Sequence, residues 1–277
     1  MPTTRIQIFV IADYGRGDPA FVEVYQYLRG LIPESSIENV YVSPLSTIQT
    51  GFWAYQLAIN YSEIKDIVKD STMKTYLFLN TAPRRDEHGP RKDNAGERLV
   101  YARLNNGLEM VGVLSGDSFS FVKPLIKELR EIDVSNHGSQ FRSRDIFPAA
   151  LKNIVDEDYS ILGGKVNLGL IPDKKPWMIA HVDGYGNMKL STLRSEVGFK
   201  SGDKLAVEIA GRSRNLTYTD GIFDVEMGEM CMAPGSSGPR EDAFLEICRR
   251  SGNAWKEFGS PGIGSKISAA SLGAQKR

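Results

Sequence analysis

Hydrophobic and polar positions alternate along the first 80 residues with the periods of strands and helices. Three continuous apolar runs, rich in β-branched and aromatic residues, have the composition of strands buried on both faces: 6–11, 37–42 and 75–79. Between these runs, residues 20–31 and 50–68 carry apolar side chains near helical spacing, and Pro33 ends the first helix. This order predicts a parallel or mixed sheet covered by helices on both faces.

The next apolar runs predict a hairpin. They lie at 99–104 and 108–114 and flank an Asn-Asn-Gly sequence, which is typical of a tight turn between antiparallel strands. An amphipathic segment that extends to Leu129 follows, and a short apolar run comes after it at 132–134. These segments continue the alternation of strands and helices.

Two polar segments interrupt the alternation. Residues 80–98 form a long loop with several basic side chains, and a loop of that length and charge in a compact domain is usually functional or mobile. Residues 140–155 predict a polar turn followed by a helix, with Ser143 or Asp145 as the N-cap.

From about residue 165 the pattern changes to short apolar runs separated by turns. We expect one helix here, at 245–258, and the apolar runs lie at 177–182, 204–209, 216–223, 229–233 and 266–268. Several short strands at close spacing are typical of a small β-barrel or sandwich. The sequence therefore predicts an α/β protein with an N-terminal mixed α/β sandwich domain at 1–164, a linker at 165–174 and a smaller C-terminal β-barrel domain at 175–277.

Composition and charge favour a small-molecule ligand. The 34 basic and 34 acidic residues give a formal net charge of zero, so neither nucleic acid nor a membrane surface is an expected partner. No apolar stretch approaches the roughly 18 residues of a membrane-spanning helix, and no signal-peptide pattern is present, so we expect a soluble, cytoplasmic protein. The two cysteines lack metal-ligand spacing and only three histidines are present, so we expect no metal.

A polar turn with two carboxylates follows the first predicted strand. Asp13 and Asp18 flank two glycines, and Pro19 fits the first position of the next helix. In open α/β sheets, ligands bind at the carboxyl ends of the strands, where both carboxylates would lie. Such a pair suits hydroxyl groups or a cationic group and would repel phosphate. The alternative is that both side chains only cap the turn.

Four separated motifs occur in the order found in one enzyme family. They are ADYGRGDPAFV at 12–22, FRSRDIF at 141–147, VDGYGN at 182–187, and SSG followed by LEI and GNAW between 236 and 255. Together they resemble the motifs of the S-adenosyl-L-methionine (SAM) hydroxide adenosyltransferases, a family that includes SAM-dependent fluorinases and chlorinases. The resemblance implies a large α/β domain, a small β-barrel domain, and SAM held between neighbouring subunits of a homotrimer.

The resemblance also implies a set of residues around SAM, none of them a metal ligand: Asp13, Asp18, Phe141, Asp183, Tyr185, Asn187, Phe223, Ser236, Ser237, Arg249 and Ser251. In this set Asp13 would accept the two ribose hydroxyls, a task suited to an ionised carboxylate. Asp18 and Asp183 would lie near the methionyl ammonium.

The remaining members of the set would hold the two ends of SAM. Ser236 and Ser237 match the pair that receives the methionine carboxylate, although a plain Gly/Ser turn is the alternative. Tyr185 and Asn187 match positions near adenine, where Tyr185 would stack, and its alternative is a role in the core. Arg249 and Ser251 match further adenine contacts.

The chain departs from the family at the nucleophile. Family members that transfer hydroxide carry an Asp where this chain has Ala82 and a His where it has Arg142. Without that acid and imidazole, water loses its usual activating groups. Arg98 matches a family Arg, and Arg85 lies in the long loop nearby.

These departures predict a cationic site that favours an anionic nucleophile. Ser143 stands where fluorinases carry a halide-contacting Ser, and it joins the predicted catalytic set of Arg142, Arg98 and Arg85. The expected activity is a substitution at the ribose C5′ of SAM in which methionine leaves and the nucleophile is not simple water. Two alternatives stay open: a catalytically silent SAM- or adenosine-binding protein, and an enzyme that uses the SAM scaffold for another co-substrate. For Arg142 the alternative role is an ion pair with Asp145 or a neighbouring carboxylate at the turn.

Overall fold

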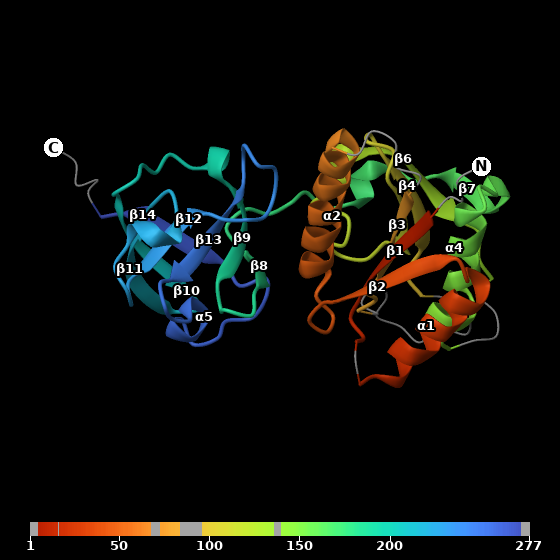
Figure 1. Cartoon of the computed structure of the whole chain (residues 1–277), viewed down its shortest axis with the longest axis horizontal. Helices are drawn as coiled ribbons and strands as arrows, with labels where there is room; N and C mark the ends of the chain where they lie inside the picture. The colour runs from red at the N-terminus through yellow and green to blue at the C-terminus, as the bar shows by residue number, and fades with distance from the viewer. Residues whose placement is uncertain (1–4, 16, 68–72, 84–95, 136–139, 273–277) are drawn as a thin grey trace. The chain divides into compact units, whose positions relative to one another are not determined.

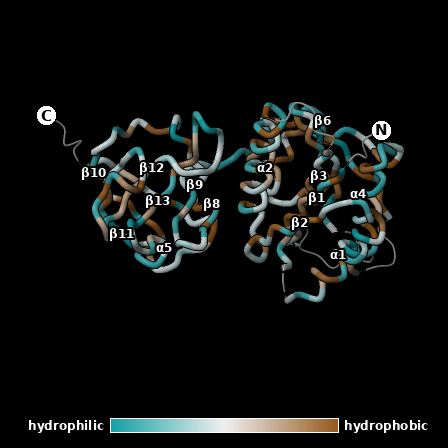
Figure 2. Tube along the Cα trace, in the orientation of Figure 1, coloured by the Kyte–Doolittle hydropathy of each residue, from teal (hydrophilic) through white to brown (hydrophobic). Residues whose placement is uncertain are grey.

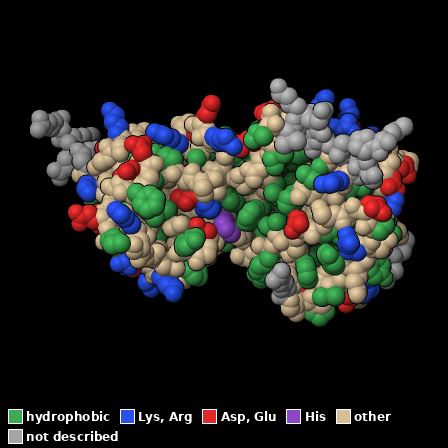
Figure 3. Space-filling model, in the orientation of Figure 1, with side chains coloured by type: hydrophobic (Ala, Val, Ile, Leu, Met, Phe, Trp, Pro, Cys, Tyr) green, Lys and Arg blue, Asp and Glu red, His purple; other side chains and the backbone are tan. Residues whose placement is uncertain are grey.

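The computed structural model describes residues 5–15, 17–67, 73–83, 96–135 and 140–272 (Figure 1). The chain divides into two compact units, Met1–Asp173 and Lys174–Arg277. The fold is mixed α/β, and each unit contains one seven-stranded sheet. Charged side chains of both signs are interspersed over the visible face of each unit (Figure 3), in keeping with the formal net charge of zero. Within the described ranges, no helix is both long enough and apolar enough to cross a bilayer.

The first unit is built on a mixed sheet with the strand order β2-β1-β3-β5-β4-β6-β7. Four strands are mutually parallel: β1 (Arg5–Ala12), β2 (Ser35–Tyr41), β3 (Met73–Asn80) and β5 (Glu109–Val113). Three antiparallel strands complete it: β4 (Leu99–Leu104), β6 (Ile126–Ile132) and β7 (Leu162–Lys165). The predicted strands and the hairpin of β4 and β5 are confirmed. Figure 2 shows hydrophobic stretches along the inner strands.

Helices cover both faces of this sheet, as predicted. Along β1, Ile8 and Val10 point to the face covered by α1 (Pro19–Leu31) and α4 (Phe147–Val155). Ile11 points to the opposite face, which is covered by α2 (Thr47–Ile67). Alternate side chains of one strand therefore enter two separate cores, which explains why the strands are continuous apolar runs.

The segment before α4 differs from the expectation. A short helix α3 (Arg142–Asp145) precedes α4, and the N-cap positions are Phe141 and Ile146, neither of which makes a side-chain capping bond. The expected caps Ser143 and Asp145 are instead part of α3. Pro148 in the first turn of α4 needs no N–H partner, so this start is stable without a polar cap.

The amphipathic segment that extends to Leu129 becomes a strand. Turns at 115–122 and a 3₁₀ turn at Lys123–Leu125 lead into β6, which pairs with β4. Residues 165–173 pack on this unit: β7 pairs with β6, and Lys123 Nζ donates to the Ile171 carbonyl at 2.8 Å. Most of the segment expected as a linker, 165–174, thus belongs to the first unit.

The second unit is a sheet that curls into a half-barrel, with the strand order β14-β10-β11-β12-β13-β9-β8. Its strands are β8 (Ile179–Val182), β9 (Met188–Leu193), β10 (Lys204–Ile209), β11 (Arg212–Tyr218), β12 (Met230–Pro234), β13 (Phe244–Arg249) and β14 (Ile267–Ser271). A bridge between Met178 and Lys266 brings the two edge strands together.

The expected helix at 245–258 is wrong. Its first half is strand β13, which pairs with β12 and β9, and only a short helix α5 (Ala254–Glu257) follows. Leu245 and Ile247 enter the core of the half-barrel while Glu246 points to the other face, which is the period of a strand. The error arises because the sequence of β13 is apolar enough to fit either period over so short a run.

We predict that Leu28→Ala lowers the free energy of unfolding of the first unit by about 2–5 kcal/mol, because Leu28 is fully buried between α1 and the sheet. Val22→Ala on the same helix is the matched control, since Val22 is 51 % exposed, and should change it by less than about 0.5 kcal/mol. Urea unfolding monitored by circular dichroism measures both. Equal midpoints for the two variants would contradict the placement of α1.

Candidate functional site

The strand order reverses between the neighbouring parallel strands β1 and β3. The chain leaves β1 for β2 on one side, and it leaves β3 for β4 and β5 on the other. At such a switch point the loops diverge and leave a crevice at the carboxyl ends of the strands. Asp13 and Tyr14 follow β1, and Asn80 ends β3, so these three residues lie at the carboxyl ends of the two strands beside the switch point.

A hydrogen-bonded chain of polar side chains crosses this switch point. Asn80 Nδ2 donates to Tyr14 Oη at 2.9 Å, and Ser143 Oγ donates to Asn80 Oδ1 at 3.1 Å. Asn80 is only 2 % exposed, so its amide is held in one orientation by two partners. The network joins the predicted turn at 12–22 to the predicted turn at 141–147 through a residue that the sequence analysis did not single out.

A second group of hydroxyls supports the end of β3. Thr81 Oγ1 lies 2.7 Å from Thr50 Oγ1 of α2, and Ser115 Oγ donates to the Thr81 carbonyl at 2.6 Å. All three residues are buried. They were missed because isolated Thr and Ser carry no motif, although each of Thr81 and Ser115 closely follows an apolar run, which is a usable signal.

The Tyr14 phenol stays protonated in this setting. Burial raises the pKa of Tyr14 well above its ordinary value, the hydrogen bond from Asn80 opposes this, and the Asp13 carboxylate raises the pKa further. Since the Tyr14 oxygen accepts from Asn80, its own O–H is directed elsewhere. Tyr14 therefore keeps its proton near neutral pH and is not a base there.

Arg142 lies beside this network. Its Nη1 donates to the Glu97 carbonyl at 3.4 Å, and its guanidinium lies 4.9 Å from the centre of the Phe147 ring. The neighbouring Arg144, by contrast, binds Asp145 and Glu23 at 2.5 Å each and lies over the Phe141 ring. Phe141 thus packs beneath Arg144.

Ser143 is the predicted catalytic residue whose partner is best defined. Because its hydroxyl proton points at Asn80 Oδ1, Ser143 presents oxygen lone pairs rather than a proton to any further neighbour. That direction does not suit a halide contact, which needs a donor.

Two further predicted catalytic residues are not brought into the network. Arg98 has a side chain 59 % exposed and lies 3.8 Å from the Glu131 carboxylate of β6. Such an exposed pair contributes little to stability. Arg85 lies outside the described residues.

Asp18 closes its own turn. Its Oδ2 accepts from the Gly15 amide at 3.0 Å, and its amide donates to the Gly15 carbonyl at 3.0 Å. Asp18 occupies the N-cap position of α1 without a side-chain bond to the helix. It also lines an open pocket of about 720 Å³ together with Tyr25 and Tyr41.

In the second unit, the predicted VDGYGN motif forms the turn between β8 and β9. Asp183 Oδ1 accepts from the amides of Tyr185 and Asn187 at 2.9 and 3.0 Å, and Asp183 Oδ2 accepts from Asn187 Nδ2 at 3.1 Å. Gly186 has φ +84°, and a Cβ there would lie 2.2 Å from the Asn253 side chain. The turn therefore packs directly on the predicted GNAW segment, where the Trp255 amide donates to the Gly186 carbonyl at 2.9 Å.

The predicted serine pair lies near a charged pair that the sequence analysis missed. Lys189 of β9 binds Glu246 of β13, and Lys189 Nζ also donates to Ser236 Oγ at 3.2 Å. Ser237 is 6 % exposed, and its carbonyl accepts from the Phe244 amide at 2.8 Å. Burial lowers the pKa of the nearby His181 below its ordinary value, and the Lys189 charge lowers it further, so His181 is neutral near pH 7.

The other predicted contacts to the ligand lie at the surface of this unit. Tyr185 and Phe223 are 82 % and 80 % exposed, which excludes the core role for Tyr185. Arg249 is used locally, since its Nη1 donates to Glu257 at 2.6 Å and its Nε to the Gly228 carbonyl at 2.9 Å. Ser251 sits in the turn after β13 with φ +56°.

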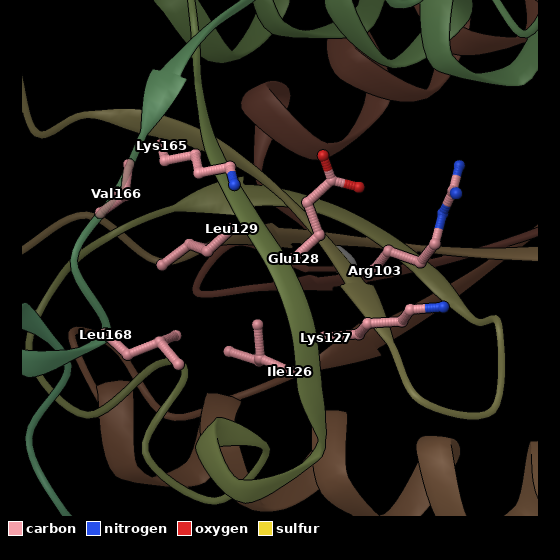
Figure 4. Close-up of a pocket in the computed structure, with 8 residues that line it drawn as sticks. All are labelled: Arg103, Ile126, Lys127, Glu128, Leu129, Lys165, Val166 and Leu168. Carbon is pink, nitrogen blue, oxygen red and sulfur yellow. The ribbon is translucent and has the colours of Figure 1, made fainter.

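A separate pocket of about 340 Å³ lies along β6 (Figure 4). Lys127 and Lys165 line it together with Arg103, which is already paired with Glu109 at 2.9 Å. Because Glu109 begins β5, this pocket lies at the opposite end of the sheet from the switch point. Within the described part of the chain, no group of three or more His, Cys, Asp and Glu side chains could hold a metal ion.

Comparisons with known proteins support the fold alone. No family model and no curated protein matches the sequence. Among solved structures, an uncharacterized conserved protein from Thermotoga maritima has 18 % identity and a TM-score of 0.72, and the match covers 95 % of this chain and 99 % of that one. A conserved hypothetical protein from Thermus thermophilus has 17 % identity and a TM-score of 0.65, with the same coverage. The two-unit α/β fold is thus shared over nearly the whole chain.

We predict that Asn80→Ala lowers the free energy of unfolding by about 1–3 kcal/mol, because it leaves the hydrogen-bonding groups of Tyr14 and Ser143 without their buried partner. Asn60→Ala on the exposed side of α2 is the control and should have an effect below about 0.5 kcal/mol. Thermal unfolding of both variants is the measurement. A difference of zero between them would show that the Asn80 network does not stabilise the switch point.

Proposed function

We propose that this chain binds SAM and displaces methionine from the ribose C5′ with a small nucleophile other than simple water. The observation that supports this most is the pairing of four motifs that are distant in the sequence. The turns at 12–22 and 141–147 are linked through Asn80, and the turn at 182–187 packs on the segment at 252–255. The motif resemblance and the two-unit α/β fold are consistent with one another.

In the proposed complex, Asp13 accepts the two ribose hydroxyls. Its place at the switch point is where α/β sheets bind ligands, and its ionised carboxylate can take two donors at once. The Tyr14 hydroxyl adds a donor at the same edge. Asp183 accepts from the methionyl ammonium. Its carboxylate has roughly four acceptor sites, and the three hydrogen bonds within its turn leave at least one of them for the ligand.

The proposed reaction needs little from the protein besides alignment. The nucleophile bonds to C5′ as the bond from C5′ to the sulfonium sulfur breaks, and the electron pair leaves with methionine. An anionic nucleophile needs no base, which fits the presence of Ala82 and Arg142 in place of the family acid and imidazole. Arg142 stays charged at neutral pH and would hold the anion.

A catalytically silent SAM-binding protein is the second candidate. It is favoured by the contacts of Arg142, whose guanidinium is already used by the Glu97 carbonyl and the Phe147 ring. The two candidates agree on SAM binding and on a homotrimer with the site between subunits, and they differ only in turnover. Product analysis therefore decides between them.

We predict that Asp13→Ala weakens SAM binding about 10- to 100-fold, because the ribose diol loses a charged acceptor. Asp66→Ala on the exposed end of α2 is the matched control and should leave the affinity unchanged. Isothermal titration calorimetry measures both. Equal affinities of the two folded variants would remove the ribose role of Asp13.

We also predict that the unmodified protein converts SAM slowly in water alone, since the usual ~10² to 10⁴-fold help from an acid and base is missing. Adding halides and other small anions one at a time, and measuring methionine and the adenosyl product by chromatography, identifies the nucleophile. Arg142→Ala should abolish turnover with that anion and change SAM affinity only a few-fold. Rapid formation of adenosine that persists in Arg142→Ala would refute the anion site, and no turnover with any anion favours the silent binder.

A further inference from the structure

A nearly buried ion pair lies on the face of the half-barrel sheet that points away from its hydrophobic core. Lys189 and Glu246 are direct neighbours on β9 and β13, and their side chains are only 11 % and 8 % exposed. The residues that flank them, such as Met188 and Ile247, point into the core instead. Burying two charges costs free energy, which a pair repays only when further hydrogen bonds are made.

Both charged side chains make further hydrogen bonds to Ser236, in the turn that follows β12. Lys189 Nζ donates to Ser236 Oγ at 3.2 Å, and the Ser236 amide donates to Glu246 Oε1 at 3.0 Å. Gly235 lies so close that a Cβ on it would come within 2.1 Å of Glu246 Oε1. The pair therefore fixes both the backbone and the hydroxyl of Ser236.

The chemistry of the donor fixes the direction of the Ser236 hydroxyl. A lysine ammonium has only hydrogens to give, so the Ser236 oxygen must accept from it. The Ser236 O–H is then free to donate to a third group, and Ser236 itself is exposed, so a ligand can reach it. A donor hydroxyl polarised by an adjacent ammonium suits a carboxylate oxygen.

We propose that Lys189 is a positioning residue that holds the Ser236 hydroxyl as a donor toward the α-carboxylate of the substrate, and so makes the site selective for adenosyl sulfonium compounds that carry this carboxylate. The inference rests on the proposed binding of SAM. Glu246 has the supporting role of keeping the ammonium in place and cancelling its charge, so selectivity comes from the direction of one hydrogen bond and not from a net positive field.

The test compares two ligands that differ only in the carboxylate, SAM and decarboxylated SAM. For the unmodified protein we expect SAM to bind more tightly. Lys189→Met should weaken SAM binding about tenfold and leave the affinity for decarboxylated SAM within about twofold, because the Ser236 hydroxyl is no longer held as a donor toward the carboxylate. Lys189→Met/Glu246→Gln, which removes the buried charge left behind, should give the same change if the single variant folds poorly.

A double-mutant cycle with Ser236→Ala shows whether Lys189 acts through Ser236. Ser236→Ala should lose the same selectivity, and adding Lys189→Met to it should change the ratio of the two affinities no further. Equal weakening of both ligands, an unchanged ratio in Lys189→Met, or additive effects in the cycle would each overturn the inference. Failure of the unmodified protein to bind either ligand would instead refute the proposed function, so the two failures are distinguishable.

Discussion

The structure of the first unit depends on the pairing of β1 with two parallel neighbours, β2 on one side and β3 on the other. To reach β3 from β2, the chain must cross over β1, and it does so with α2 on the face opposite to α1. The same crossing makes the loops after β1 and β3 diverge at the carboxyl ends of these strands. Polar side chains can be buried at these strand ends only because they hydrogen-bond to one another, Asn80 to Tyr14 and Thr81 to Thr50. Fold and candidate site are thus consequences of one topological constraint.

Most elements of this sheet could be predicted from the sequence, because a strand buried on both faces leaves a continuous apolar run and a helix leaves a 3.6-residue period. The partners of the polar side chains could not. Asn80 closely follows a predicted strand, but its bonds to Tyr14 and Ser143 span 66 and 63 positions. The first bond exists because β1 pairs with β3, and the second because α3 returns to the end of β3. Strand order decides such contacts, and no local pattern encodes that β4 lies between β5 and β6.

The second unit shows a different limit of local patterns. Lys189 lies in a strand that the sequence did not predict, and Glu246 lies in the segment expected as a helix, so neither was expected to be buried. Their importance arises from register, because β9 and β13 place them side by side on the face away from the core. The shortness of β13 explains why it was expected as a helix. Six mostly apolar residues fit the helical period and the strand period equally well, and only pairing with β12 and β9 selects the strand.

Two of the charged side chains near the candidate residues, Arg144 and Lys189, lie in ion pairs. Arg144 is neutralised by Asp145 and Glu23, and Lys189 by Glu246, while the switch point adds neutral hydroxyls and an amide. A field of one sign would favour ligands by net charge, but compensated charges favour them by the direction of individual hydrogen bonds. A ligand with an ammonium and a carboxylate on one carbon, as in the methionyl group of SAM, has no net charge there to be attracted. Recognition of such a group therefore has to rely on fixed donors and acceptors, and the turns at Asp183 and Ser236 have their backbone groups held in place by a buried or partly buried carboxylate.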